Sequence, residues 1–337
     1  MTGQTVSHYR MLEKLGVRPG SRANRKFGIF RPPSFEAAAP VGREYTCLMP
    51  DASRREFLAA LGAFSALPPK KAVVAAHPWV YAATRPKNDI TGILDGIFED
   101  MRYAGMEAIE LMHTALRPDD AVERIGELSR KHRLPVLGTS YSANMWKPEE
   151  RNAILEEAEL LVGRLAKLGG RTLGVSVGNA GKPKTSEQLD AQAEALRRIM
   201  PVCQAHKVVL NLHNHTYEVA DNEHDLKGTL ERIPEVKLGP DIDWLVKAGV
   251  EPLDFIRRHG KRIVFAHLRD QKADGVWSEA MGEGSLDYRA VARALREVGF
   301  AGDVAIELAH PSGFQPTRPL RESLKMSREY VRRVMGY

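Results

Sequence analysis

From residue 72 onward the sequence alternates short apolar runs with longer amphipathic stretches, and this alternation constrains the fold more than any other feature. The eight runs cover residues 72–79, 105–111, 134–141, 171–178, 207–214, 236–243, 262–270 and 303–310. The stretches between them have helical periodicity. One such stretch places on a single face Ile154, Ala158, Leu161 and Leu165. We therefore expect strands and helices in regular alternation.

This alternation favours parallel strands joined by right-handed crossovers. Eight strand–helix units suit a (β/α)₈ barrel, which typically takes ~250 residues. An open, doubly wound sheet is the alternative, but such a sheet usually carries a Gly-rich turn after its first strand. The stretch "AAHPWVYAATRP" contains no glycine. We expect an α/β chain with a barrel domain at residues 72–337 and an N-terminal extension at residues 1–71.

The extension shows no sustained period through residue 50, and we expect it to be poorly ordered. Residues 53–71, "SRREFLAALGAFSALPPKK", place Arg54 and Arg55 before an apolar stretch of mostly small residues. This order of charged start, short apolar region and polar boundary resembles a twin-arginine export signal. The alternative is an amphipathic helix that caps the barrel. The signal predicts a periplasmic protein; without it we expect a cytoplasmic one.

Charge and composition exclude several classes of partner. Residues 1–71 hold twelve Lys/Arg and five Asp/Glu, so the remaining residues carry −1 of the total charge of +6. A nucleic-acid-binding domain would cluster basic residues on its own surface. The two cysteines, Cys47 and Cys203, provide neither a disulfide framework nor a thiolate zinc site. No apolar run is long enough to span a membrane. We expect a small-molecule substrate and leave a homo-oligomer open.

Ligand-type side chains stand at the ends of the last four expected strands. They are His213, Asp241, His267 and Glu307. In a (β/α)₈ barrel the chemistry collects at the carboxyl ends of the strands. Neighbouring strands lie ~4.8 Å apart, so side chains at one height on adjacent strands reach a common centre. A single histidine in this position is more often a structural group, but four such residues together favour a metal site.

Two imidazoles and two carboxylates suit a borderline divalent cation better than Ca²⁺. We expect one divalent ion, with Mn²⁺ first and Co²⁺, Fe²⁺, Zn²⁺ or Mg²⁺ as alternatives. Such an ion, chelated by adjacent carbonyl and hydroxyl oxygens, acts as a Lewis acid that makes a neighbouring C–H bond easier to break.

Five motifs occur in the order "EAIEL", "DIDWLVKAGVEP", "VFAHLRDQ", "GEGSLDYRAVARAL" and "FAGDVAIEL". Together they make residues 72–335 resemble the sugar phosphate isomerase/epimerase family, the xylose isomerase-like TIM barrels. In that family the metal ligands come from strands five to eight. The resemblance implies that Asp241, His267 and Glu307 are three of these ligands.

The strand-five position departs from the family pattern. Many members have a glutamate where this sequence has His213. In the ketose 3-epimerases of the family, the glutamates of strands five and eight act as opposed acid and base. The His-x-His pair of His213 and His215 is closer to the inosose dehydratase-like members. This departure leaves the reaction type open.

The resemblance implies a divalent-metal-dependent isomerase or epimerase acting on a keto sugar or related polyol through a metal-stabilised enediolate. The alternative is a metal-dependent dehydratase or lyase acting on an oxidised sugar or inosose. An apurinic endonuclease on a related barrel would need a basic groove, which a charge of −1 disfavours. A non-catalytic sugar-binding barrel would not need the ligand set.

Candidate roles follow for the remaining polar residues. We expect Glu307, His213 and His215 to carry protons. The expected substrate contacts are His77, Glu110, His113, Trp244 and Glu283. Asp270 and Glu218 are expected to support the residues that touch metal or substrate. For each of these loop-entry groups the plainer alternative is a side chain that satisfies local backbone groups or packs at the rim.

Overall fold

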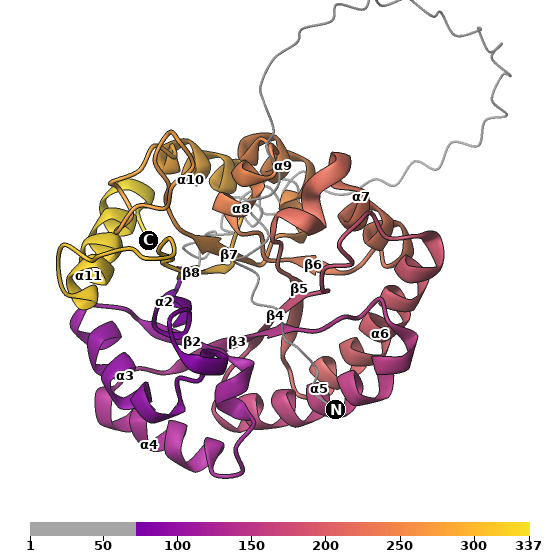
Figure 1. The fold of residues 1–337 in the computed structure, drawn as a ribbon, viewed down its shortest axis with the longest axis horizontal. Helices are drawn as coiled ribbons and strands as arrows, with labels where there is room; N and C mark the ends of the chain where they lie inside the picture. Colours follow the sequence, from indigo (N-terminus) through magenta and orange to yellow (C-terminus); the bar gives the residue numbers. More distant parts are fainter. Residues whose placement is uncertain (1–71) are drawn as a thin grey trace, which may run out of the picture. The chain divides into compact units, whose positions relative to one another are not determined.

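The computed structural model describes residues 72–337, and these form a barrel of parallel strands (Figure 1). Each strand overlaps one of the eight apolar runs. The strands are β1 (Val74–Ala76), β2 (Ala108–Met112), β3 (Val136–Ser142), β4 (Thr172–Ser176), β5 (Val209–Leu212), β6 (Lys237–Leu238), β7 (Phe265–Leu268) and β8 (Asp303–Ile306). The expected (β/α)₈ barrel, a TIM barrel, is therefore confirmed. The predicted export signal at residues 53–71 lies outside the described residues.

The sheet runs in the order β6-β5-β4-β3-β2-β1-β8-β7, so only β6 and β7 are left to close it. Isolated bridges join them at Leu238–Ile263 and at Asp241–His267. The amide of His267 donates to the carbonyl of Pro240 at 2.9 Å. The barrel therefore closes at the same point where two of the expected ligands lie.

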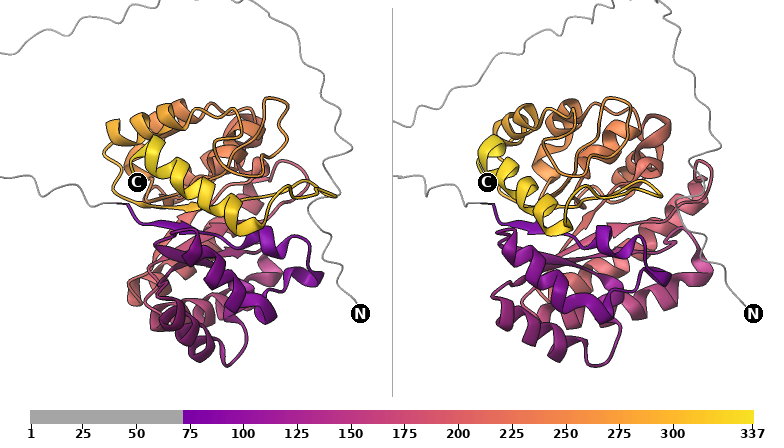
Figure 2. Two further views of the ribbon diagram at one scale, coloured as in Figure 1. Left: turned by 90° about the vertical axis from the view of Figure 1, so that its left-hand side faces the viewer. Right: turned by 60° about the vertical axis from the view of Figure 1, so that its left-hand side comes forward.

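Helices surround the strands (Figures 1 and 2). They are α2 (Trp79–Ala82), α3 (Leu94–Tyr103), α4 (Ala121–His132), α5 (Arg151–Lys167), α6 (Ser186–Ala205), α7 (Thr216–Arg232), α8 (Ile242–Lys247), α9 (Pro252–His259), α10 (Tyr288–Glu297) and α11 (Leu320–Tyr330). The last helix packs beside α3, where the Tyr103 hydroxyl donates to Glu322 at 2.8 Å. This contact completes the ring of helices.

Local features define where α6 begins and where α7 is interrupted. Thr185 caps α6, because its hydroxyl accepts from the backbone N–H of Gln188 and the Gln188 side chain accepts in return. α7 is interrupted after Val219: Asp221, Asn222 and Glu223 have positive φ angles. The first turn of α7, which follows His215, is therefore a separate short piece.

The core has two parts. The larger lies between the strands and the helices and includes Cys203, which is buried as expected for a small apolar residue. The smaller fills the inside of the barrel with Ala75, Ala108, Leu137, Phe265 and Ala305. Because strand side chains alternate between faces, the residue two positions after each of these also points into the barrel. That periodicity positions the site.

Candidate metal centre

Polar residues follow the inner apolar layer along the same strand faces. Two positions beyond Ala75, Ala108, Phe265 and Ala305 stand His77, Glu110, His267 and Glu307. The interior therefore changes from apolar to ionisable within one step of the strand period, toward the carboxyl ends of the strands. This end of a (β/α)₈ barrel is where active sites are found.

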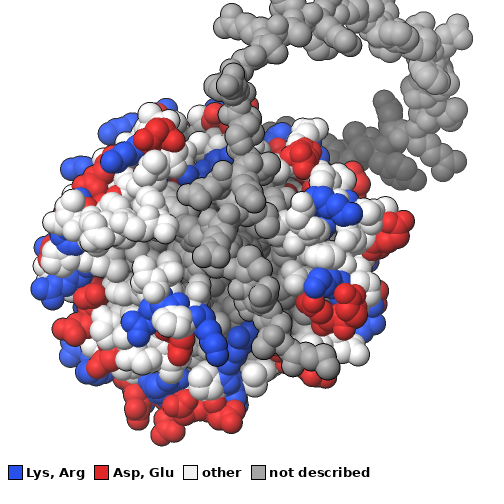
Figure 3. All heavy atoms as spheres, viewed as in Figure 1, with Lys and Arg blue, Asp and Glu red and all other residues white. Residues whose placement is uncertain are grey.

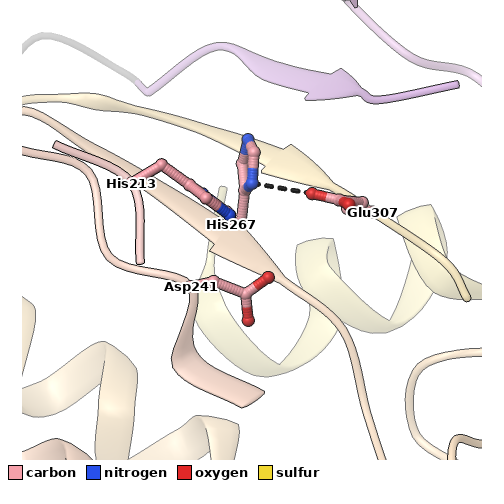
Figure 4. A group of neighbouring side chains, drawn as sticks. All are labelled: His213, Asp241, His267 and Glu307. Carbon is pink, nitrogen blue, oxygen red and sulfur yellow. Dashed lines mark ion pairs between the residues drawn. The ribbon is translucent and has the colours of Figure 1, made fainter. Parts of the chain in front are cut away.

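The four expected ligands converge at this end (Figure 4). His213 directly follows β5, Asp241 precedes α8, His267 is part of β7, and Glu307 directly follows β8. Each offers one ligand atom, and these atoms all lie within 4.8 Å of one another. The expectation that four strand ends would bring these residues together is therefore met, and the cluster is of a kind that can bind a metal ion.

Unpartnered nitrogens indicate that this cluster fits a cation. The buried Nδ1 atoms of His213 and His267 have no hydrogen-bond partner within residues 72–337. His267 Nδ1 lies 2.7 Å from Glu307 Oε2 and forms an ion pair with it when the ring is protonated. Buried polar atoms are rarely left without partners unless they serve a ligand or another function. Two imidazole nitrogens beside two carboxylates match the donors that borderline divalent ions prefer.

The protonation states suit such a role. Burial raises the pKa of Glu307, but Arg269 and the neighbouring histidines outweigh it and hold that pKa well below its usual value. Burial lowers the pKa of His213 well below the usual value, so its ring is neutral. Burial also lowers the pKa of His267, but Glu110 and Glu307 raise it to about 10. Cation binding at His267 therefore requires this ring to release a proton.

Arg269 is a site residue that the sequence analysis missed. Its guanidinium is buried and donates to Asp241 Oδ2 at 2.6 Å, and it lies 2.9 Å from Glu307 Oε1. It lies over the rings of Trp244 and Trp277, at 5.4 and 5.8 Å from their centroids. Arg269 stands two residues after His267, so the strand period would have placed it on the same inward face. It orients both carboxylates of the cluster.

His215 lies beside the cluster in a hydrogen-bonded group of its own. Its ring centroid is 5.0 Å from that of His213 and 5.6 Å from that of Trp244. Buried Glu218 accepts from the backbone N–H of His215 at 2.7 Å and from the hydroxyl of Ser176 at 2.5 Å. The same hydroxyl lies 3.2 Å from His215 Nδ1. Glu218 and Ser176 therefore fix the position of His215.

Two of the expected substrate contacts lie within the cluster rather than at its edge. His77 is buried, 3.8 Å from Glu307 through Nδ1 and 2.9 Å from the Ser140 hydroxyl through Nε2. Glu110 is fully buried and lies 2.6 Å from His267 Nε2. The structure thus gives Glu110 a contact with an expected ligand, where the sequence had suggested a contact with substrate.

The other expected contacts lie further out. His113 packs against Tyr141 with the ring centroids 5.4 Å apart. Glu283 forms an ion pair with Arg318 at 2.6 Å. Trp244 is close to both Arg269 and His215 and is therefore the member of this group nearest to the cluster.

Asp270 supports a loop rather than the cluster itself. Its carboxylate accepts from the backbone N–H groups of Gln271, Gly282, Gly284 and Leu286. A Cβ atom at Gly284 would lie 2.1 Å from Asp270 Oδ1, so only glycine fits there. One buried carboxylate thus folds the "GEGSL" loop that follows β7. Asp270 is predicted from the sequence to support residues that touch metal or substrate, and in the structure it holds this loop.

A family model described as "Xylose isomerase-like TIM barrel" matches residues 98–330. The chain belongs to this family. The match covers most of the described barrel, including all four residues of the cluster. No curated protein matches the chain in sequence. The resemblance read from the motifs is thereby confirmed at the level of the family, while the inosose dehydratase-like variation of strand five stays a prediction.

Solved structures of sugar-acting enzymes share the fold. An L-ribulose 3-epimerase has a TM-score of 0.65 at 18% identity, covering 79% of this chain and 95% of the other. A sugar phosphate isomerase/epimerase from Parabacteroides distasonis has 0.62 at 14%, covering 79% and 95%. A 3-keto-D-glucoside 4-epimerase from E. coli has 0.57 at 17%, covering 77% and 100%. At these identities the likeness establishes the fold alone.

On the face drawn in Figure 3, acidic and basic side chains are interspersed among the described residues rather than gathered in one basic field. Among residues 72–337, none of the helices is long and apolar enough to cross a membrane.

Proposed function

We propose that the protein is a divalent-metal-dependent isomerase or epimerase that acts on a keto sugar or a related polyol. The observation that carries this proposal is the convergence of His213, Asp241, His267 and Glu307, with ligand atoms within 4.8 Å of one another. The buried Nδ1 of neutral His213 supports it, because no residue of the described chain forms a hydrogen bond with this nitrogen. The names of the structural neighbours, which include two sugar epimerases, support the choice of a sugar as substrate.

The ligand set would hold one divalent ion, for which we propose Mn²⁺. When bound, the ion would supply Lewis acidity that stabilises the negative charge of an enediolate-like state. The buried guanidinium of Arg269 lies between Asp241 and Glu307 and would hold their carboxylates in position around the ion.

Glu307 is the residue we propose as the base. Its pKa is well below the usual value despite its burial, so the carboxylate is ionised and can accept a proton. The proton would come from the substrate carbon next to the carbonyl. His215 is the proposed second proton carrier, because Glu218 and Ser176 hold its ring beside His213 and Trp244. Two carriers from separate strand ends would let a proton leave one face of the carbon and another return to the opposite face.

The histidine at the strand-five position supports an alternative. Where a glutamate would serve as a base, neutral His213 would be a metal ligand, and His215 would act as a general acid. A base at Glu307 and an acid at His215 would remove a proton and expel a β-hydroxyl as water. This reaction is that of a dehydratase acting on an oxidised sugar or inosose.

We also propose export to the periplasm, on the basis of the twin-arginine pattern at residues 53–71. This location favours substrates without a phosphate group. N-terminal sequencing of the mature protein tests it, and a mature chain that begins before Arg54 would exclude it.

The test of the proposed function combines metal analysis with a substrate screen. Elemental analysis of the purified protein should find one divalent ion per chain. Candidate ketoses incubated in D₂O should yield an epimer or isomer of unchanged composition, with deuterium at the reacting carbon when the proton exchanges with solvent. A product lighter by one water would instead establish the dehydratase. Glu307→Gln should fold and lose most of its turnover, and full turnover in this variant would refute the assignment of the base.

A further inference from the structure

Glu110 is an ionisable residue whose position in the core needs an explanation. It lies in β2 with none of its surface exposed. Its Oε2 is 2.6 Å from Nε2 of His267, which lies in β7, and β1 and β8 separate these strands in the sheet. Its Oε1 has no hydrogen-bond partner within the described chain.

Stability alone does not account for this carboxylate. A buried charge with one unpartnered oxygen is costly, and apolar residues of similar size often replace buried ion pairs without loss of stability. The contact nevertheless has a definite chemical effect on its partner. Because Glu110 occupies Nε2 of His267, the ring can offer only Nδ1 to the centre of the cluster, where Nδ1 lies 2.7 Å from Glu307 Oε2.

We infer that Glu110 is a positioning residue that makes Nδ1 the metal-binding nitrogen of His267. Glu110 would accept a hydrogen bond from Nε2–H of His267. This would hold the imidazole ring in one tautomer and fix its orientation toward Asp241 and Glu307. Histidine ligands in metal sites commonly donate their second ring nitrogen to a carboxylate in this way. The inference rests on the metal site of the proposed function and adds to it the residue that orients one ligand.

The inference predicts different metal affinities for two variants of Glu110. Glu110→Gln keeps an oxygen that can accept from Nε2–H but loses the charge, so the affinity for the metal should fall modestly. Glu110→Leu removes the acceptor and frees the ring to turn or change tautomer, so the affinity should fall further. Losing a partner that orients a ligand typically weakens metal binding about 10–100-fold, and we expect the two variants at the two ends of this range.

The experiment measures Zn²⁺ affinity by competition with a chromophoric chelator, for the full chain and for both variants. Asp303→Asn is the matched control. Asp303 is also a buried strand carboxylate, but it pairs with Arg171 at 2.7 Å, away from the cluster. The Zn²⁺ affinity of the Asp303→Asn variant should equal that of the wild type. Equal affinity in Glu110→Leu and the wild type would overturn the inference and leave the metal site intact.

A crystal structure of the Zn²⁺-loaded wild type gives a second, independent readout that does not depend on a variant folding. The ion should lie on Nδ1 of His267, with Nε2 within hydrogen-bond distance of Glu110. An ion on Nε2 would overturn the role of Glu110 while supporting the proposed function. A wild-type chain that binds no Zn²⁺ would overturn both.

Discussion

Two buried polar groups in this molecule differ in how completely they are satisfied. The first is the metal-site cluster described above. The second, which we call the Lys184 network, consists of Lys184, Gln192, Asp225 and Thr229. In the network, Lys184 donates to Gln192 at 2.7 Å and to Asp225 at 2.6 Å, and Gln192 donates to Asp225 and Thr229, each at 2.7 Å. No side-chain atom of the network lacks a partner, whereas several atoms of the cluster do.

The difference teaches how to separate a structural polar group from a functional one. The Lys184 network ties α6 and α7 together, and each of its charges has a counterpart. The cluster and its neighbours Glu110 and Arg269 hold four buried atoms without a hydrogen-bond partner: Glu110 Oε1, His213 Nδ1, His267 Nδ1 and Arg269 Nε. Buried polar atoms without partners are costly, so a group that keeps several of them is suited to binding rather than to stability.

The largest expected effect distinguishes the two groups by metal binding. His213→Ala removes a proposed ligand whose buried Nδ1 has no hydrogen-bond partner. Metal affinity should fall by more than about 100-fold, because residues that only orient a ligand already account for about 10–100-fold. The free energy of unfolding of the metal-free protein should change less than in a variant that breaks the Lys184–Asp225 ion pair. Chelator competition and urea unfolding measure the two quantities, and a variant that retains wild-type affinity would remove His213 from the site.

Much of this site was predictable because it follows from strand periodicity. The strand ends at Asp241, His267 and Glu307 could be aligned once the apolar runs were read as strands. Contacts across the barrel could not be predicted, since they depend on which inner residues face one another. Glu110 and His267 are 157 residues apart in strands that do not pair, and the sequence therefore left Glu110 as a substrate contact.

Ion pairs between residues far apart in the sequence could not be predicted for a similar reason. Arg269 shares the inward face of His267, but an arginine after a strand usually reaches solvent. Its burial could be predicted only once the positions of the Asp241 and Glu307 carboxylates were known. Glu283 stands in a loop that follows β7, and its partner Arg318 follows β8. Only the folded chain shows that this glutamate is paired near the barrel rim.

The next effect tests the Lys184 network as a purely structural group. Asp225→Ala leaves Lys184 as a buried charge without its counterpart. Breaking a buried ion pair in this way costs about 3–5 kcal/mol of unfolding free energy. Metal affinity should not change, because the network lies outside the cluster. The double variant Lys184→Met/Asp225→Leu should recover most of the stability, since apolar residues of similar size replace both charges. A loss of metal in Asp225→Ala that persists in the double variant would contradict the separation of the two groups.

The smallest effect concerns His113, a predicted substrate contact that belongs to neither group. Burial, with a contribution from Arg117, lowers its pKa to about 4 from the usual 6.5. A histidine whose pKa is depressed in the folded state stabilises the protein above the unfolded-state value, and this stability is lost as the pH falls from 6.5 toward 4. The loss attributable to His113 should be about 2 kcal/mol.

His113→Phe keeps a ring against Tyr141 but does not titrate, so the unfolding free energy of this variant should fall less than that of the wild type between pH 7 and pH 4.5. Urea unfolding at both pH values measures this difference. Equal losses would show that His113 is solvated and open to a ligand, as the sequence suggested.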